Sequence, residues 1–92
     1  MSLSFDGSSP RPARFAVEAR AEPGLLSRLL APFSRRALEP DVMRARRRGE
    51  TLHVRFALND MPAELIQGIA GNLRQVVGVL NVRVESGHND PL

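Results

Sequence analysis

A Pro-Gly pair at residues 23–24 separates two apolar patterns of different period, so the chain must pass from strand to helix almost without a loop. Residues 14–20 (RFAVEAR) alternate apolar and polar side chains, which predicts a strand with one buried face. Residues 24–37 carry an apolar stripe at helical spacing, formed by Leu25, Leu26, Leu29, Leu30 and Phe33. Pro32 falls inside this stripe and should bend or shorten the helix.

The middle of the chain predicts a hairpin. Residues 41–45 (DVMRA) are typical of a short strand, and residues 46–50 (RRRGE) of a turn around a glycine. Residues 51–58 (TLHVRFAL) alternate again, with Leu52, Val54, Phe56 and Leu58 on one face. Two such strands joined by a tight turn pair with each other in antiparallel fashion.

A second helix and a last strand follow the hairpin. Asn59 or Asp60 is the expected N-cap, with Pro62 in the first turn and Glu64 at the positive end of the helix dipole. The expected buried side is Leu65, Ile69, Leu73 and Val76 or Val77. Residues 79–85 (VLNVRVE) then predict a strand whose inward side chains are Leu80, Val82 and Val84.

The predicted order is therefore βαββαβ. This order indicates an α+β, ferredoxin-like fold: a four-stranded antiparallel sheet with both helices on one face. We expect one domain over 13–85 and flexible tails at 1–12 and 86–92, which are rich in Ser, Gly and Pro. The uncovered sheet face must then meet solvent or a partner.

Composition excludes several classes of function. The 92 residues suffice for one small domain, and the absence of cysteine excludes disulfides and thiolate chemistry. No apolar run approaches the roughly 20 residues of a membrane span, and no signal peptide is evident, so we expect a cytoplasmic protein. All 13 basic residues are Arg, yet the net charge is only +3, which by itself says little about partners.

The strand-to-helix turn is the first candidate for a site. Gly24 permits backbone conformations that a larger residue resists, and the first helical turn leaves backbone N–H groups without partners. Such a helix start attracts a carboxylate or a phosphate. The sequence leaves open the alternative that this is only a tight turn.

Two segments, 22–36 (EPGLLSRLLAPFSRR) and 71–85 (GNLRQVVGVLNVRVE), resemble the ACT domain of the regulatory small subunits of acetolactate (acetohydroxyacid) synthase. In that family the loop reads approximately Asn-Glu-Ser/Pro-Gly-x-Leu-x-Arg before a Phe-Ser-x-Arg-Gly run. The last helix and strand read Gln-Leu-x-Lys-Leu-Val-Asp-Val. The residues in register are Gly24, Leu26, Ser27, Arg28, Phe33, Ser34, Arg36, Leu73, Val76, Val77 and Val79.

This resemblance implies a non-catalytic subunit of the short, single-domain type, which forms homodimers. It would activate or stabilise a separate catalytic large subunit in branched-chain amino acid biosynthesis. That partner would carry thiamine diphosphate, Mg and FAD, whereas this chain would hold no cofactor, metal or catalytic residue.

An amino-acid effector is also implied, at the loop before the first helix. The effector-binding residues transferred to this sequence are Ala21, Glu22, Pro23, Gly24, Leu25, Leu26 and Glu39. Ala21 and Glu39 stand where the family has Asn, so we expect a weak or absent response to valine.

Two alternatives remain beside this interpretation. One is a stand-alone ACT-type sensor of a small molecule. The other is a nucleic-acid-binding domain that uses a cluster of arginines expected at the hairpin tip: Arg44, Arg46, Arg47 and Arg48. The sequence leaves open that this cluster is a solvated turn or a protein-docking patch. Readers of RNA with this fold stack bases on aromatic side chains. The open face is instead expected to show Glu18, His53, Arg55, Asn81, Arg83 and Glu85.

Other chemistries find no support in the sequence. His53 and His88 are isolated, without the ligand spacing of a metal site. Ser27 has no base placed near it by helical periodicity, so no catalytic triad is expected.

Overall fold

The computed structural model describes residues 10–86, which form four strands and two helices around one core. The elements are β1 (Pro10–Arg20), α1 (Leu25–Ser34), β2 (Val42–Arg48), β3 (Thr51–Pro62), a 3-10 turn (Ala63–Leu65), α2 (Ile66–Arg74) and β4 (Val79–Ser86). The expected tails 1–12 and 86–92 fall mostly outside the described residues. Within the described part, residues 10–12 belong to β1 and residue 86 to β4.

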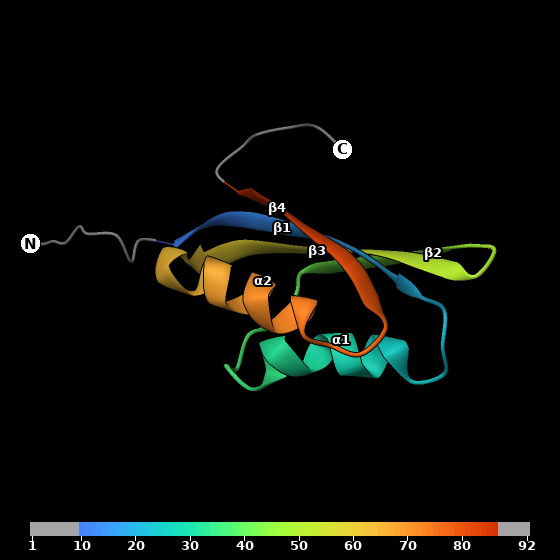
Figure 1. Cartoon of the computed structure of the whole chain (residues 1–92). Coiled ribbons are helices and arrows are strands. Elements are labelled where there is room, and N and C mark those ends of the chain that lie inside the picture. The colour runs from blue at the N-terminus through green and yellow to red at the C-terminus, as the bar shows by residue number, and fades with distance from the viewer. Residues whose placement is uncertain (1–9, 87–92) are drawn as a thin grey trace, which may run out of the picture.

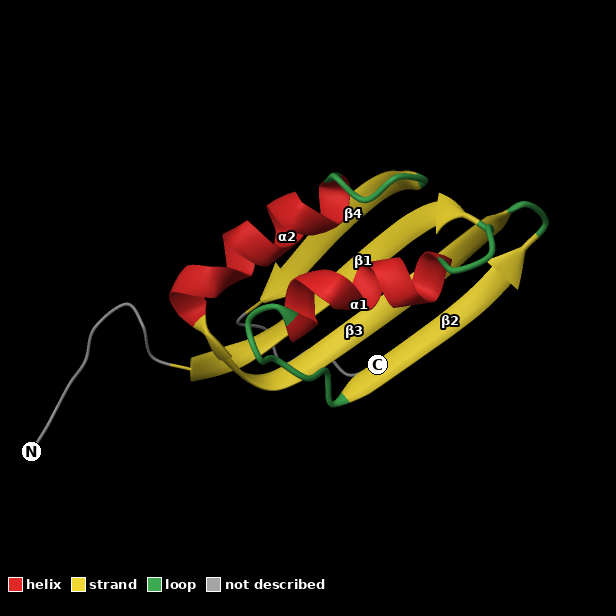
Figure 2. Cartoon of the chain, turned by 90° about the horizontal axis from the view of Figure 1, so that it is seen from below, coloured by secondary structure: helices red, strands yellow, loops and turns green. Residues whose placement is uncertain are grey.

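The sheet has the order β2-β3-β1-β4, and every neighbouring pair is antiparallel. Both helices lie on one face of it, below the sheet in Figure 1. Seen from that side in Figure 2, α1 lies over β1 and β3, while β2 extends beyond the helix layer. The predicted ferredoxin-like fold is confirmed.

Alternation along the central strands builds the core. Phe15 of β1 lies opposite Phe56 of β3, and both are fully buried on the helix side. Phe33 of α1 packs on both rings, with centroids 5.6 Å from Phe15 and 4.9 Å from Phe56. Edge-on and tilted contacts between aromatic rings stabilise the fold beyond the burial of each ring. The predicted helical stripe is therefore correct for Leu25, Leu29 and Phe33.

α1 is shorter than the expected 24–37. It ends at Ser34, and Ala37 takes a positive φ of 55° as the chain turns away. Pro32 is buried within the helix. Because proline lacks an N–H, it removes one bond of the last turn, in agreement with the expected shortening.

The predicted boundary between β2 and the following turn is wrong. β2 runs to Arg48, and only residues 49–50 form the turn, so the arginines lie in a strand and not at a hairpin tip. Every residue of β2 is exposed. An edge strand that is exposed on both faces does not need alternating apolar residues. The periodicity of apolar residues therefore predicts an end of β2 that is too early.

The predicted start of the second helix is also wrong. Asn59 and Asp60 extend β3, which continues through the buried Met61 to Pro62, the N-cap of the 3-10 turn. The backbone N–H of Asn59 donates to Oδ2 of Asp41 at 2.7 Å instead of opening a helix. β3 can extend this far because its end pairs with Pro10 and Arg11 of β1.

The inward face of β4 differs from the prediction at its first residues. A register shift between Glu18 and Ala19 of β1 leaves Leu80 without a paired partner, and its side chain is 51% exposed. Val82 is buried as expected, and Val79 packs on the core in place of Leu80. Ile66 and Ala70 of α2 join the core. After the helix, Val76 packs against the core, whereas Val77 is exposed.

Candidate functional site

The β1–α1 loop forms one side of an open hollow at the edge of the helix layer. The hollow is lined by Ala21, Glu22, Pro23, Gly24, Leu25, Leu26, Ser27, Arg47 and Leu52. Backbone hydrogen bonds hold the loop in place. Arg20 N–H donates to the carbonyl of Gly78 at 2.8 Å, and Ala21 N–H donates to the carbonyl of Glu50 at 2.9 Å. The loop is thus anchored to two other turns.

Gly24 gives the loop its shape. Its φ of 79° lies in the left-handed region, and it occupies the N-cap position of α1. Glycine has no side chain to cap the helix, so the N–H groups of Leu26 and Ser27 find no acceptor among residues 10–86. Donors at a helix start also lie in the positive end of its dipole. This wall of the hollow therefore favours an anionic group.

The side chain of Glu22 contacts two neighbouring segments, at Arg28 and at Gly78. Its Oε1 accepts a hydrogen bond from Nη2 of Arg28 at 3.0 Å, in an exposed ion pair. The same carboxylate lies against Gly78, where an added Cβ would stand 3.4 Å from Oε1. Glu22 is therefore held by its neighbours and positions the loop.

Arg47 belongs to this hollow, although the sequence analysis grouped it with the other arginines. It lies opposite Leu52 across the β2–β3 ladder, on the helix side of the sheet. Its Nε donates to the carbonyl of Gly49 at 3.0 Å, which directs the guanidinium beside the turn. Alternation along β2 would have found this residue if the strand had been extended past Ala45.

Glu39 is not part of the hollow. It lies in the connection between α1 and β2, beside a second depression with Leu30, Phe33 and Leu38. The 10-residue helix, about 15 Å long, separates it from Gly24. The structure thus brings together six of the seven residues transferred from the resemblance, and within one chain it does not bring in Glu39.

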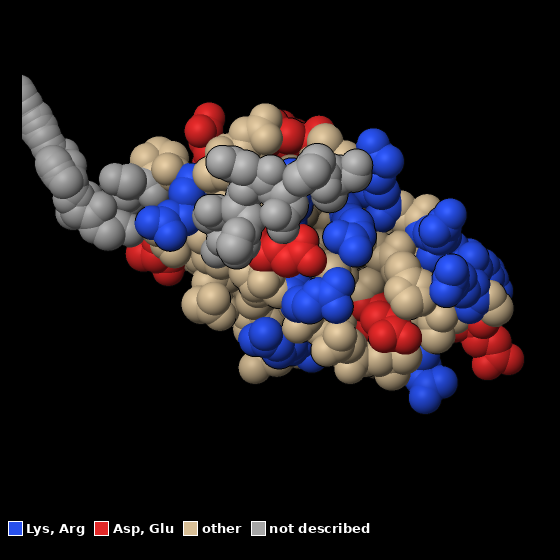
Figure 3. All heavy atoms as spheres, turned by 90° about the horizontal axis from the view of Figure 1, so that it is seen from above, with Lys and Arg blue, Asp and Glu red and all other residues tan. Residues whose placement is uncertain are grey.

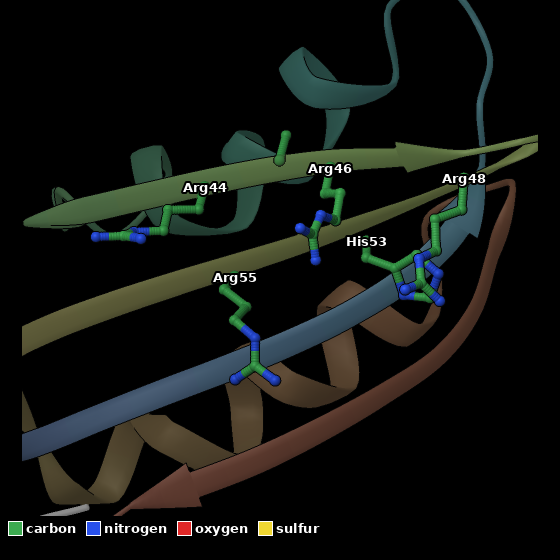
Figure 4. A pocket seen from close by; sticks show the side chains of 6 residues that line it. Arg44, Arg46, Arg48, His53 and Arg55 are labelled. Atoms are coloured by element: carbon green, nitrogen blue, oxygen red, sulfur yellow. The ribbon is translucent and has the colours of Figure 1, made fainter. Parts of the chain in front are cut away.

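The second candidate surface is the sheet face opposite the helices. Arg44, Arg46 and Arg48 of β2 and His53 and Arg55 of β3 line an open depression there. Figure 4 shows these side chains, which come from two neighbouring strands. In Figure 3, which views this face, the basic residues gather toward the end where the hairpin projects. The predicted composition of the open face is correct for Glu18, Asn81 and Arg83, which line the adjoining depression.

Among residues 10–86, this face carries charge but no aromatic platform. Phe15, Phe33 and Phe56 are all buried in the core. Its two ion pairs share one carboxylate: Glu85 lies 3.9 Å from Nη1 of Arg55 and 3.6 Å from Nε of Arg83. Base stacking, on which most readers of single-stranded RNA depend, is therefore unsupported on this surface.

Residues 10–86 hold no group of three or more His, Asp or Glu side chains arranged to bind a metal ion. No helix in the same range is long and apolar enough to cross a membrane. His53 lies on the open face, and His88 lies outside the described residues. Ser27 lines the hollow beside Arg47, without an adjacent histidine among its lining residues.

Comparisons with known proteins agree with this architecture. Residues 8–90 match the family model of the ACT-like domain. No curated protein matches the chain. Among solved structures, the crystal structure of the ACT domain from the GTP pyrophosphokinase of Chlorobium tepidum is similar, with a TM-score of 0.72 and 12% identity over 84% of this chain and 100% of that chain.

The solution structure of the same domain is similar at a TM-score of 0.70 and 12% identity, covering 87% of this chain and 91% of that chain. An uncharacterized protein from Thermotoga maritima has a TM-score of 0.68 and 12% identity, covering 86% of this chain and 99% of that chain. At such low identity these structures show a shared fold only.

Proposed function

Because this chain belongs to the ACT-like domain family, we propose that it is a regulatory subunit without catalytic activity, namely the short small subunit of acetolactate synthase. ACT domains are regulatory domains that bind small molecules. The finer assignment is supported by the loop-and-helix segment 22–36 and by the last helix and strand, 71–85. In this role the chain activates or stabilises a thiamine-diphosphate-dependent catalytic subunit in the cytoplasm.

The observation that carries the regulatory assignment is the hollow at Gly24. Its lining supplies the N–H groups of Leu26 and Ser27, which find no acceptor among residues 10–86, and also Arg47. Both suit a carboxylate, because a guanidinium and a helix start each stabilise negative charge. Leu25, Leu26 and Leu52 give the same hollow an apolar side. A small aliphatic carboxylic acid such as an amino acid fits this combination.

We further propose that the response to valine is weak or absent. Ala21 has no polar side chain, and its N–H is already bonded to Glu50. Glu39 lies at the other end of α1 in the same chain and would bring a negative charge to any carboxylate that approached it. The loop thus offers backbone donors to an amino acid but lacks the polar side chains that the resemblance places at positions 21 and 39.

Association with the catalytic subunit tests this proposal. The acetolactate synthase large subunit of the same genome is produced together with this chain, with an affinity tag on the large subunit only. Stoichiometric recovery of the untagged chain, retained through gel filtration, is the expected result. A chain that never accompanies the large subunit would favour the alternative, a stand-alone sensor whose hollow is complete within one copy.

A further inference from the structure

The open face of β2 has an unusual charge pattern. The paired segments 42–48 and 51–57 contain no Asp or Glu. Arg44, Arg46 and Arg48 form no ion pair with any described residue. Arg44 lies directly opposite Arg55, and like charges at such positions destabilise a sheet. This arrangement leaves the guanidinium groups of Arg44, Arg46 and Arg48 available to an anion.

β2 is also the edge of the sheet, so within the described part of the chain no strand pairs with its outer backbone groups. Val42 and Met43, on opposite faces of the strand, are 43% and 42% exposed. An exposed, unpaired edge strand is suited to pairing with a second copy about a two-fold axis. The anion site proposed below rests on this homodimer, which the resemblance to the acetolactate synthase small subunits implies.

Pairing of β2 with its copy brings the arginines together. In a continuous sheet with both helix layers on the same side, even-numbered residues of one strand lie opposite even-numbered residues of the other. An axis through Ala45 sets Arg44 opposite the partner's Arg46. For an axis at any residue from Arg44 to Arg48, at least one arginine lies opposite another arginine. Repulsion across the seam is thus independent of the register within that range.

We propose that this seam is a binding site for a multivalent phosphate anion, and that the bound anion stabilises the homodimer. Each copy contributes Arg44 and Arg46 of its β2, so only the dimer would carry the full set of guanidinium groups; Arg55 is already paired with Glu85. Guanidinium groups bind phosphate oxygens in bidentate fashion. Alternate residues of a strand are about 6.6 Å apart and neighbouring strands about 4.8 Å apart, a spacing that favours several linked phosphates over one.

The composition of the same face disfavours a nucleic-acid strand as the ligand. The face lacks aromatic side chains among the described residues, and the carboxylates Glu18 and Glu85 occupy its other half. A compact anion contacts only the basic half at the seam, whereas a long strand would also meet these carboxylates. The ligand is then inorganic polyphosphate or the phosphate tail of a nucleotide, which share this chemistry.

Sedimentation equilibrium of the full chain tests the site. The dimer dissociation constant is measured at one ionic strength, set with NaCl, in the absence and presence of tripolyphosphate and, separately, of ATP. We expect tripolyphosphate to lower the constant about tenfold or more, with one anion bound per dimer by calorimetry. A stronger effect of ATP identifies a nucleotide tail and an equal or weaker effect identifies polyphosphate, and both support the site.

Matched variants separate this site from general charge effects. In the absence of tripolyphosphate, R44Q/R46Q should dimerise more tightly than the wild type. Tripolyphosphate should no longer lower its dimer dissociation constant. R35Q/R74Q removes the same charge from exposed positions on the helix side and should respond as the wild type does. Equal behaviour of the two variants, or equal constants with tripolyphosphate and with NaCl alone, would overturn the site.

Three further outcomes distinguish this proposal from the function on which it rests. A dimer that ignores tripolyphosphate leaves the homodimer standing and overturns the anion site alone. A chain that stays monomeric in every condition overturns both. Loss of binding to the catalytic subunit in R44Q/R46Q, with no effect of anions on the dimer, would assign the face to protein docking and also overturn the anion site.

Discussion

Arg46 and Arg47 are consecutive in the sequence and lie on opposite faces of β2. Arg46 is opposite His53 and belongs to the depression on the open face, whereas Arg47 lines the hollow beside Gly24. One run of arginines therefore serves two surfaces, because side chains of a strand alternate between its faces.

This division predicts different effects of two substitutions with the same change of charge. Arg46→Gln should weaken the effect of tripolyphosphate on the dimer, because it removes one guanidinium from each side of the seam. Arg47→Gln should keep that effect within about twofold of the wild type, less than about 0.5 kcal/mol. Sedimentation equilibrium at constant ionic strength measures both. Equal losses in the two variants would contradict the assignment of the faces.

Valine should not stabilise the protein strongly. Without a polar side chain at Ala21, one ligand group stays unpaired, which costs about 1–3 kcal/mol, or one to two powers of ten in affinity. A ligand at about 100 times its dissociation constant would stabilise by about 2.7 kcal/mol, which is several degrees in a domain of this size. A saturable rise of that size with L-valine at sub-millimolar concentration, absent with D-valine, would contradict the prediction.

Gly24→Ala should destabilise the fold by more than about 1 kcal/mol, because a φ of 79° is unfavourable for a residue with a Cβ. Apart from its two chain neighbours, no heavy atom of the described residues lies within 4 Å of the added methyl, so the cost is one of backbone conformation. Gly71→Ala is the matched control in α2. It also adds a methyl to open space, but in a helical conformation, and should be neutral or stabilising by up to about 1 kcal/mol.

Urea or thermal unfolding measures these two free energies. An unchanged melting temperature of the Gly24 variant would mean that the turn before α1 is ordinary.

The homodimer should form through β2 and not through β4, the other edge. Met43→Asp places a carboxylate on the helix side of β2 and should weaken the dimer, because a charge buried at an interface is costly. Leu80→Asp makes the same kind of change on β4, at a side chain that is 51% exposed, and should leave the dimer constant unaltered. Gel filtration with light scattering at high micromolar concentration gives the mass. A monomeric wild type, or a stronger effect at Leu80, would contradict this interface.

Elements with a buried face could be predicted from the sequence. The alternation around Phe15 and Phe56 and the stripe through Phe33 reflect burial on the helix side, so periodicity located both central strands and α1. The residues around Gly24 were located for a related reason, since the Pro-Gly pair marks the junction of the two patterns.

Features set by tertiary pairing could not be predicted in this way. The polar end of β2 is a strand only because β3 pairs with it, and Arg47 was therefore not assigned to the hollow. Asn59 and Asp60 match the preferences of a helix cap, yet pairing of the end of β3 with β1 keeps them extended. Leu80 continues the alternation of β4 but falls where the register shifts. Local propensity yields to long-range pairing at each of these positions.

The proposed function is tested most directly by acetolactate formation by the purified catalytic subunit, holding its own cofactors, with and without this chain. We expect added chain to raise the rate or prolong activity several-fold, with an effect that saturates at a fixed stoichiometry. The chain alone should produce no acetolactate. An unchanged rate and an unchanged lifetime of the catalytic subunit, at concentrations of chain well above that of the enzyme, would contradict the proposed function.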